Sequence, residues 1–144
     1  MDSAFRKNTI NMSRRRTIKS IKRKCDHLWA EIIRSKNKGF CIKCSKKATE
    51  AHHIFKRTCN ATRFDLSNGI PLCSHCHKFD RYGFEQDQSS KWNMGIIKDF
   101  IGNKEYNRLE KLHYELKKFE VVELLNIETA LKVKLRMEVK YTKF

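Results

Sequence analysis

Two C-x-x-C pairs constrain the fold of this chain more than any other feature. Cys41 and Cys44 form the first pair, and Cys73 and Cys76 form the second. Each C-x-x-C turn points two thiolates at one position about 2.3 Å from a zinc ion, so two turns complete a tetrahedron. Four sulfur ligands leave no open coordination position, which predicts a structural zinc site. The alternative is two redox pairs, but the βαβ context that favours a redox motif is missing.

The sequence around these cysteines indicates why a metal would be needed. Residues 40–80 are rich in Cys, His, Asn and turn formers and hold few large apolar side chains. Such a segment buries little surface on folding, and zinc can contribute on the order of 10 kcal/mol of folding free energy. Weak strands are expected near residues 48–56 and 69–73, followed by a short helix that opens with the second cysteine pair.

Helices are predicted on both sides of this segment. Residues 17–36 place apolar side chains at spacings of three and four, and Gly39 is typical of a helix end. Cys25 falls on that apolar stripe, which indicates a small buried hydrophobe, whereas Cys59 lies in a polar loop and receives no role. Residues 85–90 are polar and predict a linker. Residues 92–102 form a short amphipathic helix.

The C-terminal region also reads as helical. Asn103 is expected to cap a helix with an apolar face made of Tyr106, Leu109, Leu112 and Leu116. Residues 131–141 alternate apolar and charged side chains as a strand does, yet their composition favours a helix, which is our prediction. The 144 residues match one ordinary domain. We divide them into a basic arm (1–16), an N-terminal helix (17–39), a core (40–84) and a mostly helical extension (85–144).

The charge of the chain predicts a polyanionic partner. Lysine and arginine number 32 against 16 acidic residues, a formal net charge of +16. Nucleic acid is the favoured partner over a merely lysine-rich surface, and Arg14, Arg15, Arg16 and residues 19–24 would attract its backbone. A membrane surface fits less well, because the basic segment lacks a large apolar face. No secretory signal or membrane span is evident, so we expect a soluble, cytoplasmic protein.

The histidines indicate where chemistry could take place. His52 and His53 are adjacent, and neighbouring side chains on a strand point to opposite sides, so one is expected to bind metal and the other to act as a base. A neutral imidazole can accept a proton from water near neutral pH. His77, next to the second cysteine pair, would be a second ligand to one divalent cation. The alternative is that these are polar residues packed near a zinc site.

The pattern C-x-x-C … AHHI … N … C-x-x-C-H resembles the HNH endonucleases, which have the ββα-metal fold. The segments LWAEIIRSKNKGFCIKC, AHHIFKR and RFDLSNGIPLCSHCHK, with the WNMGIIKDFIGNKEYNRLEKL tail, are similar to phage-encoded members, including the NinG/Rap group of recombination nucleases. The similarity covers roughly residues 22–120. The NinG pattern usually has Asn where His77 stands, so this chain is closer to generic HNH nucleases.

The resemblance implies a role for each matching residue. His53 would be the general base, while His52 and His77 would bind the catalytic cation. Many family members carry an acidic residue in place of His52, which leaves Mg²⁺, Mn²⁺, Ni²⁺ and Zn²⁺ all open as that cation. Asn68 would orient the His53 region or help to position metal and phosphate, although Asn68-Gly69 is also a common turn dipeptide. The four cysteines would hold structural zinc, as in the zinc-stapled subgroup.

The sequence therefore predicts an α+β protein with a small ββα-metal core, a four-cysteine zinc staple and flanking helices. Its expected function is metal-dependent hydrolysis of DNA phosphodiester bonds, in phage recombination or DNA processing. Lys56, Arg57 and Arg63 flank the expected site and could hold phosphates or be ordinary solvated charges. Cutting both strands needs two active sites, which a homodimer or two binding events would supply. The competing hypothesis is a non-catalytic zinc-ribbon DNA-binding or structural phage protein.

Overall fold

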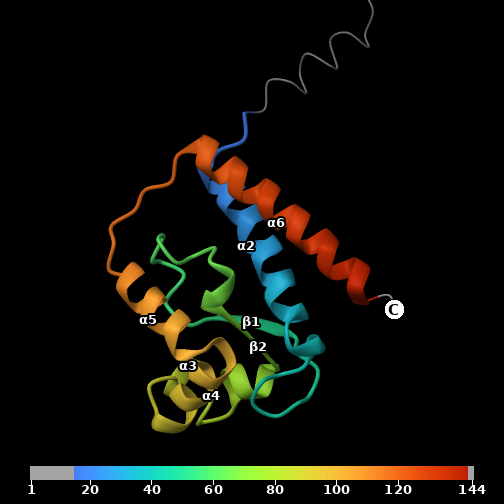
Figure 1. Cartoon of the computed structure of the whole chain (residues 1–144), viewed down its shortest axis with the longest axis vertical. Helices are drawn as coiled ribbons and strands as arrows, with labels where there is room; N and C mark the ends of the chain where they lie inside the picture. Colours follow the sequence, from blue (N-terminus) through green and yellow to red (C-terminus); the bar gives the residue numbers. More distant parts are fainter. Residues whose placement is uncertain (1–14, 143–144) are drawn as a thin grey trace, which may run out of the picture.

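The computed structural model describes residues 15–142, in which a small two-stranded sheet lies between two groups of helices (Figure 1). Along the chain these elements are α2 (Ile18–Ser35), β1 (Glu50–His53), β2 (Gly69–Leu72), the π-helical turn η3 (His75–Phe79), α3 (Phe84–Asp87), α4 (Lys91–Ile101), α5 (Asn103–Leu112) and α6 (Val121–Thr142). The short 3-10 turns η1 (Asn37–Gly39) and η2 (Leu66–Asn68) precede the two strands. The mixture of helices and a small sheet agrees with the predicted α+β class.

Helix α2 forms where the sequence predicts it. Thr17 caps its N-terminus, because the Thr17 side chain accepts a hydrogen bond from the Ser20 backbone N–H at 3.1 Å. The apolar stripe of α2 is buried and includes Trp29 and Cys25. Burial raises the pKa of the Cys25 thiol to about 11, so this side chain stays protonated, and its Sγ lies 3.7 Å from the Leu124 carbonyl oxygen. The prediction of a small buried hydrophobe is confirmed.

Helix α6 includes residues 131–141, so the preference for helix over strand is confirmed. Leu124, Ile127, Leu131 and Leu135 recur at helical spacing and pack against α2. The two helices lie side by side in Figure 1 and supply most of one of the two apolar clusters found within residues 15–142. Lys134 and Arg136 are exposed on α6, so the alternation of charged residues reflects a solvated helix face rather than a strand.

The sheet joins the two chain segments that carry the special residues. β1 and β2 are antiparallel, with Glu50 opposite Leu72 and His53 opposite Gly69. All four residues of β2 are buried. Gly69 has extended backbone (φ −137°), and a Cβ at this position would lie 2.6 Å from side-chain atoms of Ile33 and Trp29. Asn68-Gly69 is therefore not a hairpin turn, because the glycine lets α2 approach the sheet closely.

Three details of the helical extension differ from the prediction. Residues 85–90, expected as a linker, partly form α3, because the fully buried Phe84 anchors that turn in the second apolar cluster. Asn103 makes no capping hydrogen bond, and the cap position of α5 is Gly102 at φ 87°. Leu116 lies beyond the end of α5 and is fully exposed, so it does not extend the apolar face.

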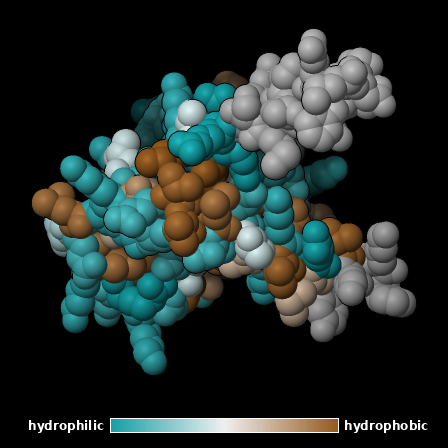
Figure 2. Space-filling model, turned by 90° about the horizontal axis from the view of Figure 1, so that it is seen from above, coloured by the Kyte–Doolittle hydropathy of each residue, from teal (hydrophilic) through white to brown (hydrophobic). Residues whose placement is uncertain are grey.

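The second apolar cluster surrounds the cysteines and packs β2 against α4. Its buried members are Cys41, Ile54, Ile70, Leu72, Cys73, Cys76, Phe84 and Ile97. The outer surface seen in Figure 2 is largely hydrophilic with a few apolar patches. Within residues 15–142, no helix combines the length and apolar character needed to cross a membrane.

Candidate functional site

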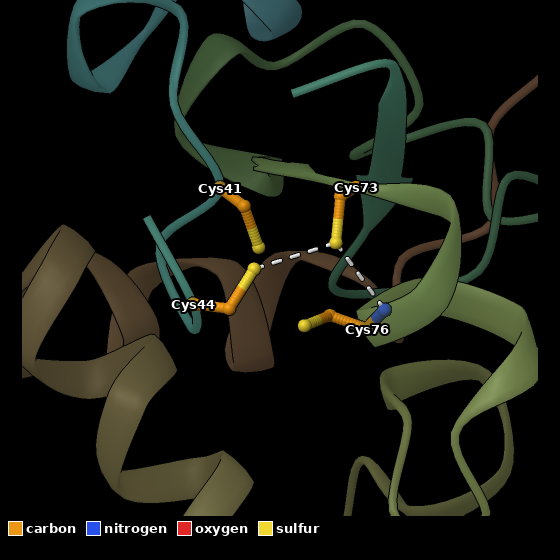
Figure 3. A group of neighbouring side chains, drawn as sticks. All are labelled: Cys41, Cys44, Cys73 and Cys76. Atoms are coloured by element: carbon orange, nitrogen blue, oxygen red, sulfur yellow. Dashed lines mark hydrogen bonds between the residues drawn. The ribbon is translucent and has the colours of Figure 1, made fainter. Parts of the chain in front are cut away.

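The four cysteines of the two C-x-x-C turns converge on one position (Figure 3). Their Sγ atoms all lie within 4.8 Å of one another, and the sulfurs of Cys44 and Cys73 are 3.5 Å apart. A tetrahedral zinc–thiolate site separates its sulfurs by about 3.8 Å, given Zn–S bonds of about 2.3 Å. The donor set and spacing therefore fit a bound metal ion. Cys41, Cys73 and Cys76 are buried, whereas Cys44 is exposed.

Backbone contacts build this group of thiols from two distant segments. The Cys41 N–H donates to the Lys46 carbonyl at 2.7 Å, which closes the first turn, and the Ile42 N–H donates to the Pro71 carbonyl of β2 at 3.2 Å. The Cys76 N–H approaches the Cys73 sulfur at 3.5 Å. Burial and the neighbouring thiols raise the pKa of Cys76 above its usual range. Four ionised thiols at this spacing need a compensating cation, which is what a divalent metal supplies.

His52 and His77 form a second cluster beside the thiols. His52 Nδ1 and His77 Nε2 are 3.0 Å apart, and β1 and η3 supply one ring each. Gln88 donates from Nε2 to the Ile54 carbonyl at 2.8 Å, so its Oε1 faces His52 Nε2 at 2.5 Å. Because that oxygen can only accept, we assign the His52 proton to Nε2 and the lone pair to Nδ1.

Glu50 orients His77 in the same way. Its carboxylate accepts a hydrogen bond from His77 Nδ1, which leaves the lone pair of His77 on Nε2. Burial acts to raise the pKa of Glu50, but the hydrogen bond from His77 and the charges of His77 and Lys78 outweigh it, and the pKa is lowered. Glu50 is therefore ionised at neutral pH and can hold this ring orientation.

These assignments direct two imidazole lone pairs at each other across 3.0 Å. Two ring nitrogens that both carry lone pairs repel each other at that distance, unless a proton or a metal cation lies between or beside them. Burial lowers the pKa of His52 to about 4, so a proton on His52 is disfavoured at neutral pH. A divalent cation bound by His52 Nδ1 and His77 Nε2 fits this donor set.

His53 points to the other side of β1. Its ring stacks on Trp29 of α2, with centroids 3.7 Å apart and planes 11° from parallel. Its Nε2 lies 3.0 Å from the Arg63 carbonyl oxygen, so we assign the proton to Nε2 and the lone pair to Nδ1. Burial lowers the pKa of His53 to about 4 despite that hydrogen bond. His53 is thus neutral at pH 7, with one nitrogen able to accept a proton.

Asn68 supports the loop that follows β1. It is completely buried. Its Oδ1 accepts from the Phe55 N–H at 2.8 Å, and its Nδ2 donates to the carbonyls of Phe55 and Thr62 at 3.0 Å each. This geometry supports an orienting role for the loop beside His53. Direct positioning of metal or phosphate by Asn68 conflicts with it, because the buried amide is directed at the backbone on both ends.

The basic residues singled out by the sequence have different surroundings. Lys56 and Arg57 are exposed, as is Arg15. Arg63 pairs with Asp26, with Nε to Oδ1 at 3.0 Å and Nη2 to Oδ2 at 2.6 Å. Arg16 pairs with the buried Glu128 at 2.5 Å and so helps to join the N-terminal segment to α6. Arg14 lies outside the described residues.

Sequence reasoning missed three residues that orient the histidines. Glu50 lies two positions before His52 on one strand, so the alternation of strand side chains already places both on one face. Trp29 carried only the signal of a core residue on an apolar stripe. Gln88 follows α3 in a stretch that reads as a linker, and nothing in its local sequence indicates a partner 36 positions earlier.

Comparison with known families agrees with this geometry. Residues 32–84 match the family model described as HNH endonuclease. The match covers β1, β2, η3 and both C-x-x-C turns, and therefore the residues His52, His53, Asn68 and His77. Searches of curated proteins and of solved structures found no match. The family match supports an HNH-like core in this segment.

Proposed function

We propose that this protein is a metal-dependent endonuclease that hydrolyses phosphodiester bonds of DNA. The observation that carries the proposal is the 3.0 Å approach of His52 Nδ1 and His77 Nε2, with a third imidazole, that of His53, on the neighbouring residue. A cation-binding pair beside a proton acceptor suits metal-assisted hydrolysis of a phosphodiester. The HNH endonuclease match over residues 32–84 supports the same activity.

In the proposed reaction His53 is the general base. Its Nδ1 accepts a proton from water, and the water oxygen forms a bond to phosphorus. The bond from phosphorus to the 3′ oxygen breaks, its electron pair stays on that oxygen, and the oxygen then takes a proton from solvent water. The Arg63 carbonyl holds the His53 proton on Nε2 throughout, and Trp29 keeps the ring in its plane. When bound at His52 and His77, a divalent cation supplies positive charge to the phosphate and to the leaving oxygen.

The cluster of four cysteine thiols has a supporting role in this proposal. A structural zinc at Cys41, Cys44, Cys73 and Cys76 fixes the start of η3, and therefore the position of His77 relative to β1. All four sulfurs are protein ligands, so this ion contributes no open coordination position. The catalytic cation and the structural zinc are thus two separate ions with separate ligands.

The direct test compares His53→Ala with His75→Ala. His75 is an exposed histidine of the same zinc turn and takes no part in the site, so it is the matched control. Plasmid cleavage is measured with Mg²⁺, Mn²⁺ and Ni²⁺ in turn. We expect His53→Ala to lose at least about 100-fold in rate, the typical contribution of a general base. His75→Ala should retain wild-type cleavage, and both should bind DNA equally.

The competing hypothesis makes the opposite prediction in the same assay. A non-catalytic zinc-ribbon protein would bind DNA without cleaving it under any of the metals, and His53→Ala would change nothing. The finer interpretation, a phage-encoded enzyme acting in recombination, rests on the sequence resemblance alone. Preferential cleavage of branched over linear duplex DNA tests it. Sedimentation of the protein with DNA tests whether a homodimer supplies two active sites.

A further inference from the structure

An open cleft of about 540 Å³ lies between the exposed face of α2 and the loop that follows β1. Its charged lining consists of Lys19, Lys22, Arg23, Asp26, Arg57 and Arg63. The α2 members lie at spacings of three and four, so they share one helix face, which borders the buried apolar stripe. The cleft therefore combines five cationic side chains with one carboxylate.

The one carboxylate of the cleft lining, that of Asp26, is paired with Arg63. Asp26 makes two hydrogen bonds to the Arg63 guanidinium, which fixes that side chain in the cleft wall. Within residues 15–142, none of the other four cations forms an ion pair. Lys22 is half-buried, and burial together with repulsion from Arg63 and Arg57 lowers its pKa. The cleft thus concentrates positive charge that this part of the chain does not balance, which favours an anion.

Arg63 connects this cleft to the proposed catalytic base. Its carbonyl accepts the hydrogen bond from His53 Nε2, while its guanidinium lines the cleft. The guanidinium also lies 3.4 Å from the Arg57 carbonyl, which ties the two arginines of the loop together. An anion in the cleft would therefore be held by the same residue that orients His53.

We propose that this cleft binds a backbone phosphate of the nucleic acid that flanks the phosphate to be cut. The proposal rests on the endonuclease function for the position of the cut. The arginines present planar donors and the lysines present compact charges, the two forms of contact that proteins make to phosphodiester oxygens. A phosphate contact of this kind fixes the register of the nucleic acid without reading its sequence.

The test measures duplex affinity as a function of salt. Lys22→Gln and Arg57→Gln are each introduced into full-length, zinc-loaded His53→Ala protein, which binds without cleaving. Lys111→Gln is the matched control, since Lys111 is an exposed lysine of α5 outside the cleft. We expect each cleft variant to weaken binding of a labelled duplex about 3- to 10-fold near 100 mM KCl. Each should also reduce the slope of log affinity against log salt by about one.

With His53 intact, the cleft variants should raise KM and leave kcat nearly unchanged, because a flanking phosphate contributes equally to the ground and transition states. Equal effects of Lys22→Gln and Lys111→Gln on the salt slope would overturn the phosphate site. A cleft that binds inorganic pyrophosphate through Lys22, with duplex affinity unchanged in the variant, would also overturn it. Circular dichroism confirms that each variant retains its helices.

Failure of this proposal is distinguishable from failure of the endonuclease proposal. If the wild-type protein never cleaves DNA but the cleft variants lose affinity and salt slope as expected, the phosphate site stands without the enzyme. If cleavage depends on His53 while Lys22→Gln and Arg57→Gln behave as the Lys111→Gln control does, the enzyme stands and the phosphate site is wrong.

Discussion

At the scale of single residues, the chemistry of the site depends on which ring nitrogen of each histidine holds a proton. Three acceptors decide this. Gln88 Oε1 fixes His52, the Glu50 carboxylate fixes His77, and the Arg63 carbonyl fixes His53. Each acceptor leaves the opposite nitrogen with its lone pair. Removing such an acceptor is expected to reduce metal affinity or activity almost as much as removing the histidine that it orients.

Replacing Gln88 with Leu tests this dependence. The change removes the acceptor from His52 Nε2 and the donor from the Ile54 carbonyl, so the His52 ring loses its fixed orientation. We expect the affinity for a catalytic cation to fall roughly 10- to 100-fold. Calorimetric titration of zinc-loaded protein with Mn²⁺ measures it. Gln86→Leu, an exposed neighbour of the same residue type, should leave the affinity unchanged, and equal losses in both variants would argue against the assignment.

The sequence was enough to name the cysteines and histidines as candidate ligands, but it did not reveal the residues that orient them. Cysteine and histidine carry a chemical signal in their identity, and the C-x-x-C spacing brings two donors together locally. Gln88 and Trp29 carry no such signal. They act on the histidines only because α2 and the residues after α3 fold back onto β1, and that contact depends on the tertiary structure.

At the scale of secondary structure, the strands are too short to be stable alone. β1 and β2 pair over four residues each, and a two-stranded hairpin is marginal in water. The cluster of four cysteines lies at the end of β2, and α2 packs against both strands, so both support the sheet. Zinc binding should therefore determine whether the central segment folds.

Replacing Cys73 with Ser should remove that support. The variant loses one of the four clustered thiols, at the residue that directly follows β2, so we expect loss of bound zinc and unfolding of residues 40–84. Zinc content by atomic absorption and hydrogen exchange of β1 and β2 measure these effects. Cys59→Ser is the control. Cys59 lies outside the cluster of four cysteines, so this variant should keep the zinc. Protected strands in a zinc-free Cys73→Ser protein would contradict this account.

Helices were predicted better than their ends. The apolar stripe of α2 runs from Ile21 to Ile33 and dominates the local signal, so the position of the helix was clear from the sequence. The start of α5 was less clear, because Asn103 has the residue type of a cap but Gly102 occupies the cap position. The role of Gly69 was not accessible either, since it depends on how closely α2 approaches the sheet.

At the scale of the whole molecule, α6 adds a second helical layer to α2, outside the segment matched by the family. Its contact includes one buried carboxylate, Glu128, which accepts hydrogen bonds from Arg16 and Lys132. The hydrogen bond from Arg16 lowers the pKa of Glu128 to about 2. A depressed carboxyl pKa stabilises the fold above its unfolded pKa of about 4.3, and the contribution is lost as pH falls towards the folded pKa.

Glu128→Gln isolates this contribution. At pH 7 we expect the variant to be about 1 kcal/mol less stable than wild type, a modest value because Arg16 is half-exposed. The difference should shrink as pH is lowered from about 4.5 towards 2, since wild type then protonates Glu128. Urea unfolding of both proteins at each pH measures the difference, in which any loss of zinc in acid cancels. A difference that does not change with pH would exclude the ion pair as its source.

The central claim is that a cation binds between His52 and His77, apart from the four cysteines. Anomalous diffraction from crystals grown with Mn²⁺ tests it most directly. The account predicts a manganese peak about 2.1 Å from both His52 Nδ1 and His77 Nε2, with a separate zinc peak at the thiols. Protein that cleaves DNA with Mn²⁺ while its crystals show no manganese at these two nitrogens would contradict it.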